Sequence, residues 1–306
     1  MRNYRKYTLK VQTLTPIILS PRASFAFYRD ALIDDDDSVF FKTGVRNDFN
    51  EEKEYSVIYP FFRYGEYEQL NPSMAAYYIP GSSIKGALSS GTNYGKNSLA
   101  LMVDDITGLN TGDFKIISPK KSQYFNELPQ IGYWENVLNK QACDGGKITD
   151  GISIPQLLPF FAGTVGIESL RAGVVFNIDI RCESNGNKDI DAILSDVNKT
   201  TVNKLESYIN QLTDFIKRIE ELHGKFASNE TVNKECCMSS ITSLQAIIDF
   251  TAEQMENAKE NSLIFLGGYK GLIRSIKTYN KEDASAIFVD NENRPFGFAK
   301  VIQVGD

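Results

Sequence analysis

The sequence predicts an α+β fold, and three stretches carry this prediction. Residues 6–14 alternate between apolar and polar side chains, and residues 174–181 do the same. This period of two is typical of strands with one buried face. Residues 200–224 and 239–260 instead carry apolar side chains three or four positions apart, which is typical of amphipathic helices. A sheet covered by helices is therefore expected.

The remaining elements are expected at intervals between these stretches. A helix is expected at 82–97 after a Pro-Gly turn, because such a turn ends the preceding strand. Residues 99–106 are expected to form a buried strand that ends in two acids. Further strands are expected at 114–118 and within 164–182, and one or two more after residue 271.

Composition limits the class of protein. The chain has 306 residues, 42% of them hydrophobic, which is enough for one large domain or two small ones. No apolar run approaches the ~20 residues of a membrane helix, and the start of the chain lacks the apolar core of a signal peptide. A cytoplasmic protein without membrane contact is expected. The few potential metal ligands have no zinc-site spacing, so no metal and no cofactor are expected. They are His223, Cys143, Cys182, Cys236 and Cys237.

Charge is unevenly distributed along the chain, whose net charge is -6. Residues 1–29 hold six cations and no acid, whereas residues 30–54 hold nine acids and three cations. Residues 261–281 hold four cations and no acid. The net charge argues against a free-standing nucleic-acid binder, but this distribution is compatible with a locally basic groove.

The stretch Tyr77–Leu88, YYIPGSSIKGAL, has the chemistry of a phosphate grip. A Pro-Gly break leads into a helix whose first N–H groups favour an anion, and a serine hydroxyl is expected to cap that helix. A lysine adds a full charge, and the glycines allow close approach of a ligand to the backbone. The candidate binding residues are Gly81, Ser82, Ser83, Lys85 and Gly86.

The same stretch has other interpretations. A Walker P-loop does not fit, because Lys85 precedes Gly86 and only three residues separate Gly81 from Lys85. An ordinary strand–turn–helix junction fits the physical pattern about as well as a phosphate site.

A second glycine-rich stretch lies at 264–278, IFLGGYKGLIRSIKT. Glycine-rich loops bring backbone N–H groups near a phosphate, and an aromatic ring within the loop offers a stacking surface for a base. The candidate binding residues are Gly267, Gly268, Tyr269, Lys270, Gly271 and Arg274.

Two stretches of the region 22–76 have open interpretations. Four consecutive acids at 34–37 favour a solvated turn over a metal site, because blocks of like charge are usually exposed. The aromatic run at 55–64 favours core packing for most of its rings, with packing on a neighbouring protein or base stacking as alternatives.

Several segments together resemble the RAMP superfamily, the RNA-binding subunits of CRISPR effector complexes. IPGSSIKGAL is similar to the family signature, although Ser89 stands where an Arg is usual. LKVQTLTPIILS resembles the family's first strand, and residues 168–176 resemble its Glu…Gly-x-x-Phe hairpin. The tail RPFGFAKVIQV at 294–304 resembles the ending of the fifth subunit of type III-A Csm complexes, with Phe296 in place of the usual Leu.

This resemblance implies a ferredoxin-like, RRM-type fold. It implies an RNA-binding half at 1–185, with insertions near 22–76 and 119–160, and a second half at 186–306 with helices, the glycine-rich loop and closing strands. It also implies a non-catalytic subunit that caps the 3′ end of the CRISPR RNA and supports guide maturation and antiviral interference.

The implied partners are the CRISPR RNA, the adjacent backbone RAMP subunit of the type III complex and, indirectly, the target RNA. In this interpretation Lys85, Lys270 and Arg274 pair with phosphates, and Tyr269 stacks on a base.

Three alternatives stay open. The chain is a backbone-type subunit that cleaves target RNA with an aspartate within 30–48, or a RAMP-type processing endonuclease, or a globular protein whose glycine loops are coincidental. The endonuclease ranks low, because such enzymes commonly use a His or a Tyr/Lys set near the N-terminus and the only histidine here is His223.

Overall fold

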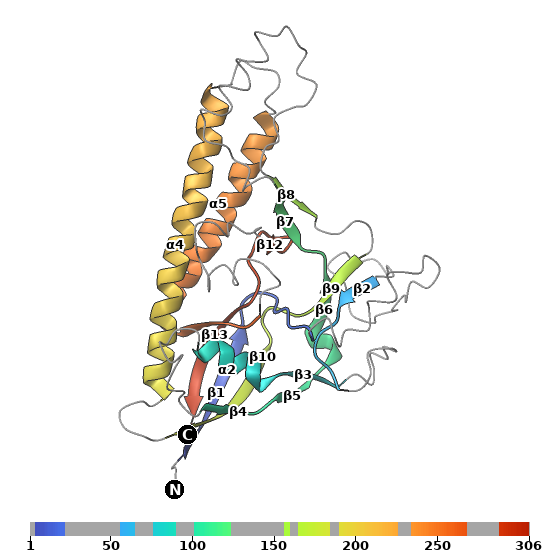
Figure 1. Cartoon of the computed structure of the whole chain (residues 1–306), viewed down its shortest axis with the longest axis vertical. Coiled ribbons are helices and arrows are strands. Elements are labelled where there is room, and N and C mark those ends of the chain that lie inside the picture. Colours follow the sequence, from blue (N-terminus) through green and yellow to red (C-terminus); the bar gives the residue numbers. More distant parts are fainter. Residues whose placement is uncertain are drawn as a thin grey trace.

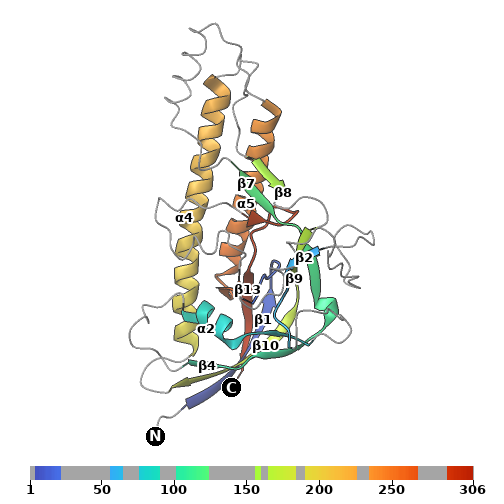
Figure 2. The same ribbon diagram turned by 45° about the vertical axis from the view of Figure 1, so that its right-hand side comes forward.

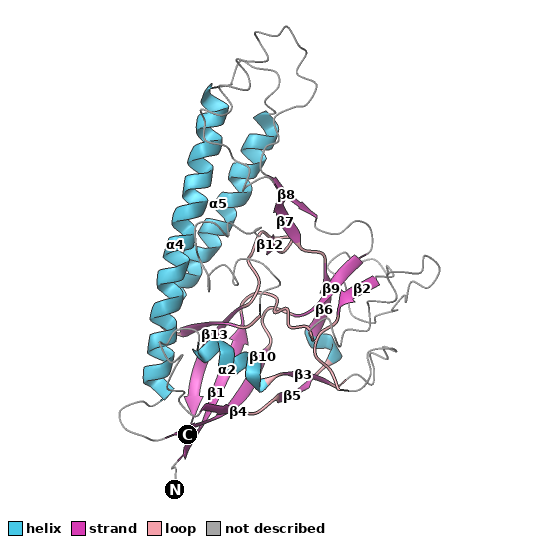
Figure 3. Ribbon diagram, in the orientation of Figure 1, coloured by secondary structure: helices cyan, strands magenta, loops and turns pink. Residues whose placement is uncertain are grey.

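The computed structural model is a mixed structure of helices and strands, and all of the strand pairs except β2 with β9 are antiparallel, so the expected α+β class is confirmed. The residues that it describes are 4–21, 56–64, 76–89, 101–123, 156–159, 165–183, 190–225, 234–267 and 288–305. Figures 1 and 3 show two long helices along one flank and the strands gathered beside them.

A five-stranded sheet forms the centre of the molecule. Its strands lie in the order β11-β13-β1-β10-β4, and every neighbouring pair is antiparallel. Their bounds are β1 Tyr4–Thr13, β4 Leu101–Val103, β10 Val175–Glu183, β11 Ser262–Phe265 and β13 Phe298–Gly305.

The two faces of β1 differ as the alternation predicted. Leu9 and Val11 are fully buried, whereas Lys6 and Lys10 are exposed. The apolar face packs against α2, Gly81–Ser89, and against the first turns of α4, Ile190–Lys225. The alternating strands therefore provide one wall of the main core, and the helices provide the other.

The two long helices are α4 and α5, Lys234–Asn257, and they lie side by side in both ribbon views (Figures 1 and 2). Leu205 and Leu212 of α4 pack with Leu244 and Ile247 of α5, as their spacing predicted. However, α4 begins ten residues before the expected residue 200, because its first apolar residues are held by the sheet. Those residues are Ile190, Ile193, Leu194 and Val197.

Three smaller sheets complete the described fold, in the orders β2-β9-β6, β12-β7-β8 and β3-β5. Their strands are β2 Ser56–Tyr59, β3 Tyr77–Ile79, β5 Ile106–Leu109, β6 Phe114–Ile117, β7 Lys120–Gln123, β8 Gln156–Pro159, β9 Val165–Leu170 and β12 Phe288–Val289. Among the described residues, one 3-10 turn, η1, spans Thr111–Asp113.

Two sequence expectations are wrong in detail. The strand expected to be buried at 99–106 is instead the short edge strand β4, with Met102 46% exposed on its outer side. The expected hairpin near 168–176 does not form, because β9 pairs with β2 and β6 while β10 pairs with β1 and β4. Position within a sheet depends on distant strands, which a local pattern does not contain.

The division of the chain at residue 185 stays a prediction. The central sheet takes β1, β4 and β10 from before that residue and β11 and β13 from after it. None of the described helices is long and apolar enough to cross a membrane.

Candidate nucleic-acid interface

Helix α2 carries the first predicted phosphate grip, and it begins two residues earlier than a cap by Ser82 would require. The carbonyl of Pro80 accepts the N–H groups of Ser83 at 2.9 Å and Ile84 at 3.4 Å. Helical structure therefore starts at Gly81. The expected hydroxyl cap from Ser82 or Ser83 is wrong, because both residues already lie inside the first turn.

Gly81 serves the packing of α2 rather than an open ligand surface. A Cβ atom at this position would lie 2.1 Å from the carbonyl oxygen of Val103 in β4. The close approach that the glycine permits is thus made by the protein's own backbone.

An acid already occupies the first N–H of α2. The Gly81 N–H donates to the Asp105 carboxylate at 2.7 Å. A carboxylate is a favourable partner for a helix N-terminus, so the position at which a phosphate was expected is satisfied internally. A phosphate placed there would also meet the negative charge of Asp105.

The outer side of α2 carries three of the predicted phosphate-binding residues. Ser82 and Lys85 are exposed one turn apart, and Gly86 is half-buried. No atom lies within 4 Å of the place where a Cβ on Gly86 would sit, so the backbone there is open to a neighbour. Within the described part of the chain, Lys85 has no ion-pair partner. We call Ser82, Lys85 and Gly86 the outer stripe of α2.

The second glycine stretch is described only at its beginning. Gly267 has φ +59°, and a Cβ there would lie 2.5 Å from the Ile18 carbonyl and from the Leu19 side chain. This glycine is therefore required by a turn that packs on Ile18–Leu19. The other candidates, Gly268, Tyr269, Lys270, Gly271 and Arg274, lie outside the described residues.

The two glycine stretches nevertheless begin from neighbouring elements. Helix α2 contacts both β4 and β11, and β11 runs directly into Gly267. Ile84 of α2 and Leu266 share the main core.

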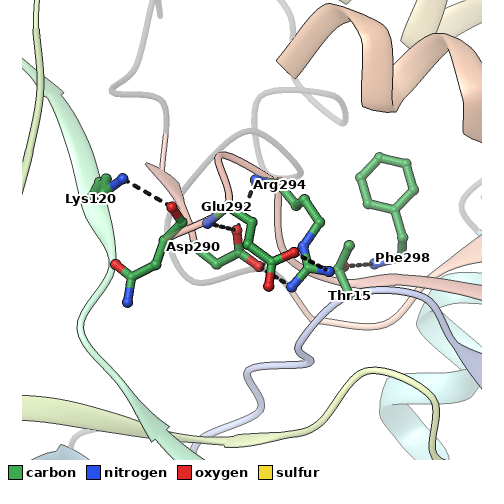
Figure 4. Close-up of polar contacts among 7 residues, drawn as sticks. Thr15, Lys120, Asp290, Glu292, Arg294 and Phe298 are labelled. Carbon is green, nitrogen blue, oxygen red and sulfur yellow. Dashed lines mark hydrogen bonds and ion pairs between the residues drawn. The ribbon is translucent and has the colours of Figure 1, made fainter. Parts of the chain in front are cut away.

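The tail is anchored to the beginning of the chain. Gly297, at φ +91°, donates its N–H to the Pro16 carbonyl at 2.9 Å, and Phe298 donates to the buried Thr15 hydroxyl at 2.9 Å (Figure 4). Two segments that carry the family resemblance, LKVQTLTPIILS and RPFGFAKVIQV, therefore meet in space.

In the turn before this tail, the charged side chains pair with one another. The buried Asp290 carboxylate accepts the Glu292 and Arg294 N–H groups at 2.9 Å each, and the Arg294 guanidinium pairs with Asp290 at 2.8 Å (Figure 4). Arg294 also pairs with Glu292 at 2.9 Å. The turn thus holds β13 in place, and its charged groups bind one another.

Glu168, the first residue of the segment that resembles the family hairpin, is a buried acid beside the signature, and its contacts were not predicted from the sequence. Glu168 of β9 is 3% exposed, and its carboxylate accepts the Tyr77 hydroxyl and, at 2.8 Å, the Phe61 N–H. Burial raises the pKa of Glu168, although these hydrogen bonds and the nearby Arg63 charge favour its ionised form. Its partners come from separate segments, so no spacing along the chain reveals the cluster.

The exposed side of the central sheet gathers cations from the basic N-terminus. Lys6 lies opposite Arg181 of β10, and both are exposed. Each has an acidic partner, Asp179 at 2.8 Å from Lys6 and Asp104 at 3.1 Å from Arg181. Hydrogen bonds from Lys6 and Thr8 lower the pKa of Asp179. Lys10, two residues further along β1 on the same face, is exposed and has no ion-pair partner among the described residues, so this face is only partly charge-balanced.

In the described ranges, no three His, Cys, Asp or Glu side chains gather as metal ligands would. The acids at 34–37 lie outside those ranges. No protein-family model matches the chain, and no curated protein matches it either.

Proposed function

We propose that this chain is a non-catalytic CRISPR RNA-binding subunit of a type III effector ribonucleoprotein. It belongs, in this proposal, to the RAMP superfamily and is closest to the fifth, 3′-end-capping subunit of type III-A Csm complexes. It binds the 3′ part of the guide and packs on the adjacent backbone subunit.

The order of the core elements supports a ferredoxin-like fold. Along the chain they run β1, α2, β4, β10, the helices α4 and α5, and β13. This is the β-α-β-β-α-β sequence of a ferredoxin-like domain, with the second helix replaced by a helical hairpin. In space the four strands lie as β13-β1-β10-β4, and β11 is an additional strand at one edge.

The observation that carries the proposal is the outer stripe of α2. The helix that follows the first core strand presents a hydroxyl, a cation without an ion-pair partner among the described residues, and an open stretch of backbone on one side. These groups suit a phosphodiester backbone and read no base sequence. A guide of any sequence fits such a contact.

The proposed mechanism is positioning rather than chemistry. Phosphate contacts from Lys85, and from Lys270 and Arg274 in the second glycine stretch, fix the register of the guide against the protein. Because the chain carries a net charge of -6, we expect weak binding of free RNA and tight binding only within the assembled complex.

The test is reconstitution of the complex with wild-type chain and with Lys85→Ala plus Lys270→Ala. The double variant should lose incorporation and protection of the guide 3′ end, while target cleavage by the remaining complex persists. Lys199→Ala plus Lys217→Ala, which removes two exposed lysines from α4, is the matched control and should behave as wild type.

Two results would contradict the proposal. An unchanged guide length and unchanged incorporation of the double variant would make both glycine stretches purely structural. Loss of target cleavage at one site, reproduced by a single aspartate substitution within 30–48, would make the chain a cutting subunit.

A further inference from the structure

Two short segments next to the signature form a ribbon with distinct sides. Tyr64 donates its N–H to the Ala76 carbonyl at 3.0 Å, and Tyr78 donates to the Phe62 carbonyl at 3.1 Å. Segments 62–64 and 76–78 therefore lie side by side and antiparallel, with a bridge between Arg63 and Tyr77. Alternate side chains along such a ribbon point to opposite sides.

The inner side is firmly held. Tyr77 is 1% exposed, donates its hydroxyl to Glu168 and stacks on Phe114, with 4.0 Å between ring centroids. Phe61 packs on the same Phe114 ring at 4.9 Å. Because these contacts come from β3, β6 and β9, they fix the position of the whole ribbon.

The outer side presents a pair of stacked rings. Tyr64 and Tyr78 lie 4.4 Å apart at an interplanar angle of 20°, and Tyr64 is 52% exposed. Phe62 supports Tyr78 from the same side, with 5.6 Å between ring centroids. Large aromatic surfaces are usually buried, so an exposed ring stacked on a half-buried one is a candidate binding surface.

We propose that the Tyr64–Tyr78 pair is a stacking platform for an unpaired base of single-stranded RNA. The inference rests on the proposed function and adds a base contact to its phosphate contacts. Tyr78 leads directly through Pro80 into α2, whose outer stripe offers Lys85 to a phosphate.

A flat aromatic ring followed by a cation that has no ion-pair partner among the described residues matches the alternation of bases and phosphates in a single strand. Such stacking accepts any base, because every base has a π-face. Because Tyr64 already stacks on Tyr78, binding of a base needs little further ordering of these rings.

The first test measures binding of a short fluorescein-labelled oligouridine, by anisotropy over a range of salt concentrations. It uses the purified chain and then the reconstituted complex. Tyr64→Ala should weaken binding about tenfold, the loss expected for one stacked base. The slope of log affinity against log salt should not change, because no charge is removed.

Two variants serve as controls for chemistry and position. Lys85→Ala should instead reduce the salt slope by about 0.7, as expected for one lost phosphate contact on a single strand. Tyr4→Ala removes another exposed tyrosine, 37% exposed on β1, and should leave the affinity unchanged.

A third variant reports stacking directly. Tyr64→Trp should keep the affinity, and the fluorescence of the new indole should fall when the oligouridine binds. The wild-type chain, with its single Trp134, supplies the background signal.

The outcomes separate this inference from the proposed function. Wild-type affinity in Tyr64→Ala together with a reduced slope in Lys85→Ala would overturn the platform and leave the phosphate contact. No oligouridine binding by the chain, and no guide contact in the complex, would overturn both. Retained RNA affinity with lost incorporation of Tyr64→Ala would show that the rings dock a protein, which also overturns the platform.

Discussion

Tyr77 and Tyr78 are adjacent residues of the same type in opposite environments. Tyr77 is buried against Phe114 and donates its hydroxyl to Glu168, whereas Tyr78 lies under the exposed ring of Tyr64. The period of two along a strand separates them. The contrast shows that one residue type can be fully buried in the core on one side of a ribbon and partly exposed on the other.

The largest expected effect comes from removing the inner ring. Tyr77→Ala should lower the free energy of unfolding by about 3–5 kcal/mol, because it leaves a cavity and deprives Glu168 of a donor. Tyr64→Ala on the outer side should change it by less than about 0.5 kcal/mol. Urea denaturation of both variants measures the difference, and equal losses would contradict the two-sided description.

The two glycines of α2 repeat this contrast at a smaller scale. Gly81→Ala would place a Cβ 2.1 Å from the Val103 carbonyl, and the required backbone shift should cost about 1–3 kcal/mol. Gly86→Ala meets no atom within 4 Å and should stabilise the helix by about 0.5–1 kcal/mol. Thermal denaturation should show melting temperatures that move in opposite directions.

Replacing Asp105 tests whether this carboxylate excludes an RNA phosphate from the start of α2. Asp105→Ala removes the acceptor of the Gly81 N–H and should cost about 1 kcal/mol, as for other lost helix caps. The same change removes a negative charge from the start of α2, so the affinity for oligouridine should rise. A fall in that affinity would show that Asp105 organises the RNA site instead of opposing it.

The last effect is a pH dependence carried by Glu168. Burial raises its pKa in the folded state above the ordinary 4.5, so its contribution to stability is full below that value and is lost as the pH rises through the folded pKa. Glu168→Gln cannot titrate. Its free energy of unfolding relative to wild type should therefore improve as the pH rises from 4 to 8.

Urea denaturation at the two pH values measures this change. A relative stability of Glu168→Gln that does not vary with pH would indicate an ordinary pKa.

Elements with a strong local period were predictable from the sequence. The faces of β1 and the apolar side of α4 follow from side-chain alternation and helical spacing alone. The roles of Gly81 and Glu168 were not predictable, because each depends on a strand from another part of the chain. The exposure of Lys85 agrees with the predicted phosphate grip. The hydrogen bond from the helix N-terminus to Asp105 was not predictable, because it depends on how β4 and β5 lie around α2.

The position of β13 has a consequence for biosynthesis. This strand lies between β11 and β1, and its register joins Leu9 to Val304. During translation, β1 leaves the ribosome long before this neighbour exists, so its edge on that side must stay unpaired until β13 has been made. The core sheet therefore closes only after synthesis of β13, and a nascent chain stalled before residue 298 should be sensitive to protease and dependent on chaperones.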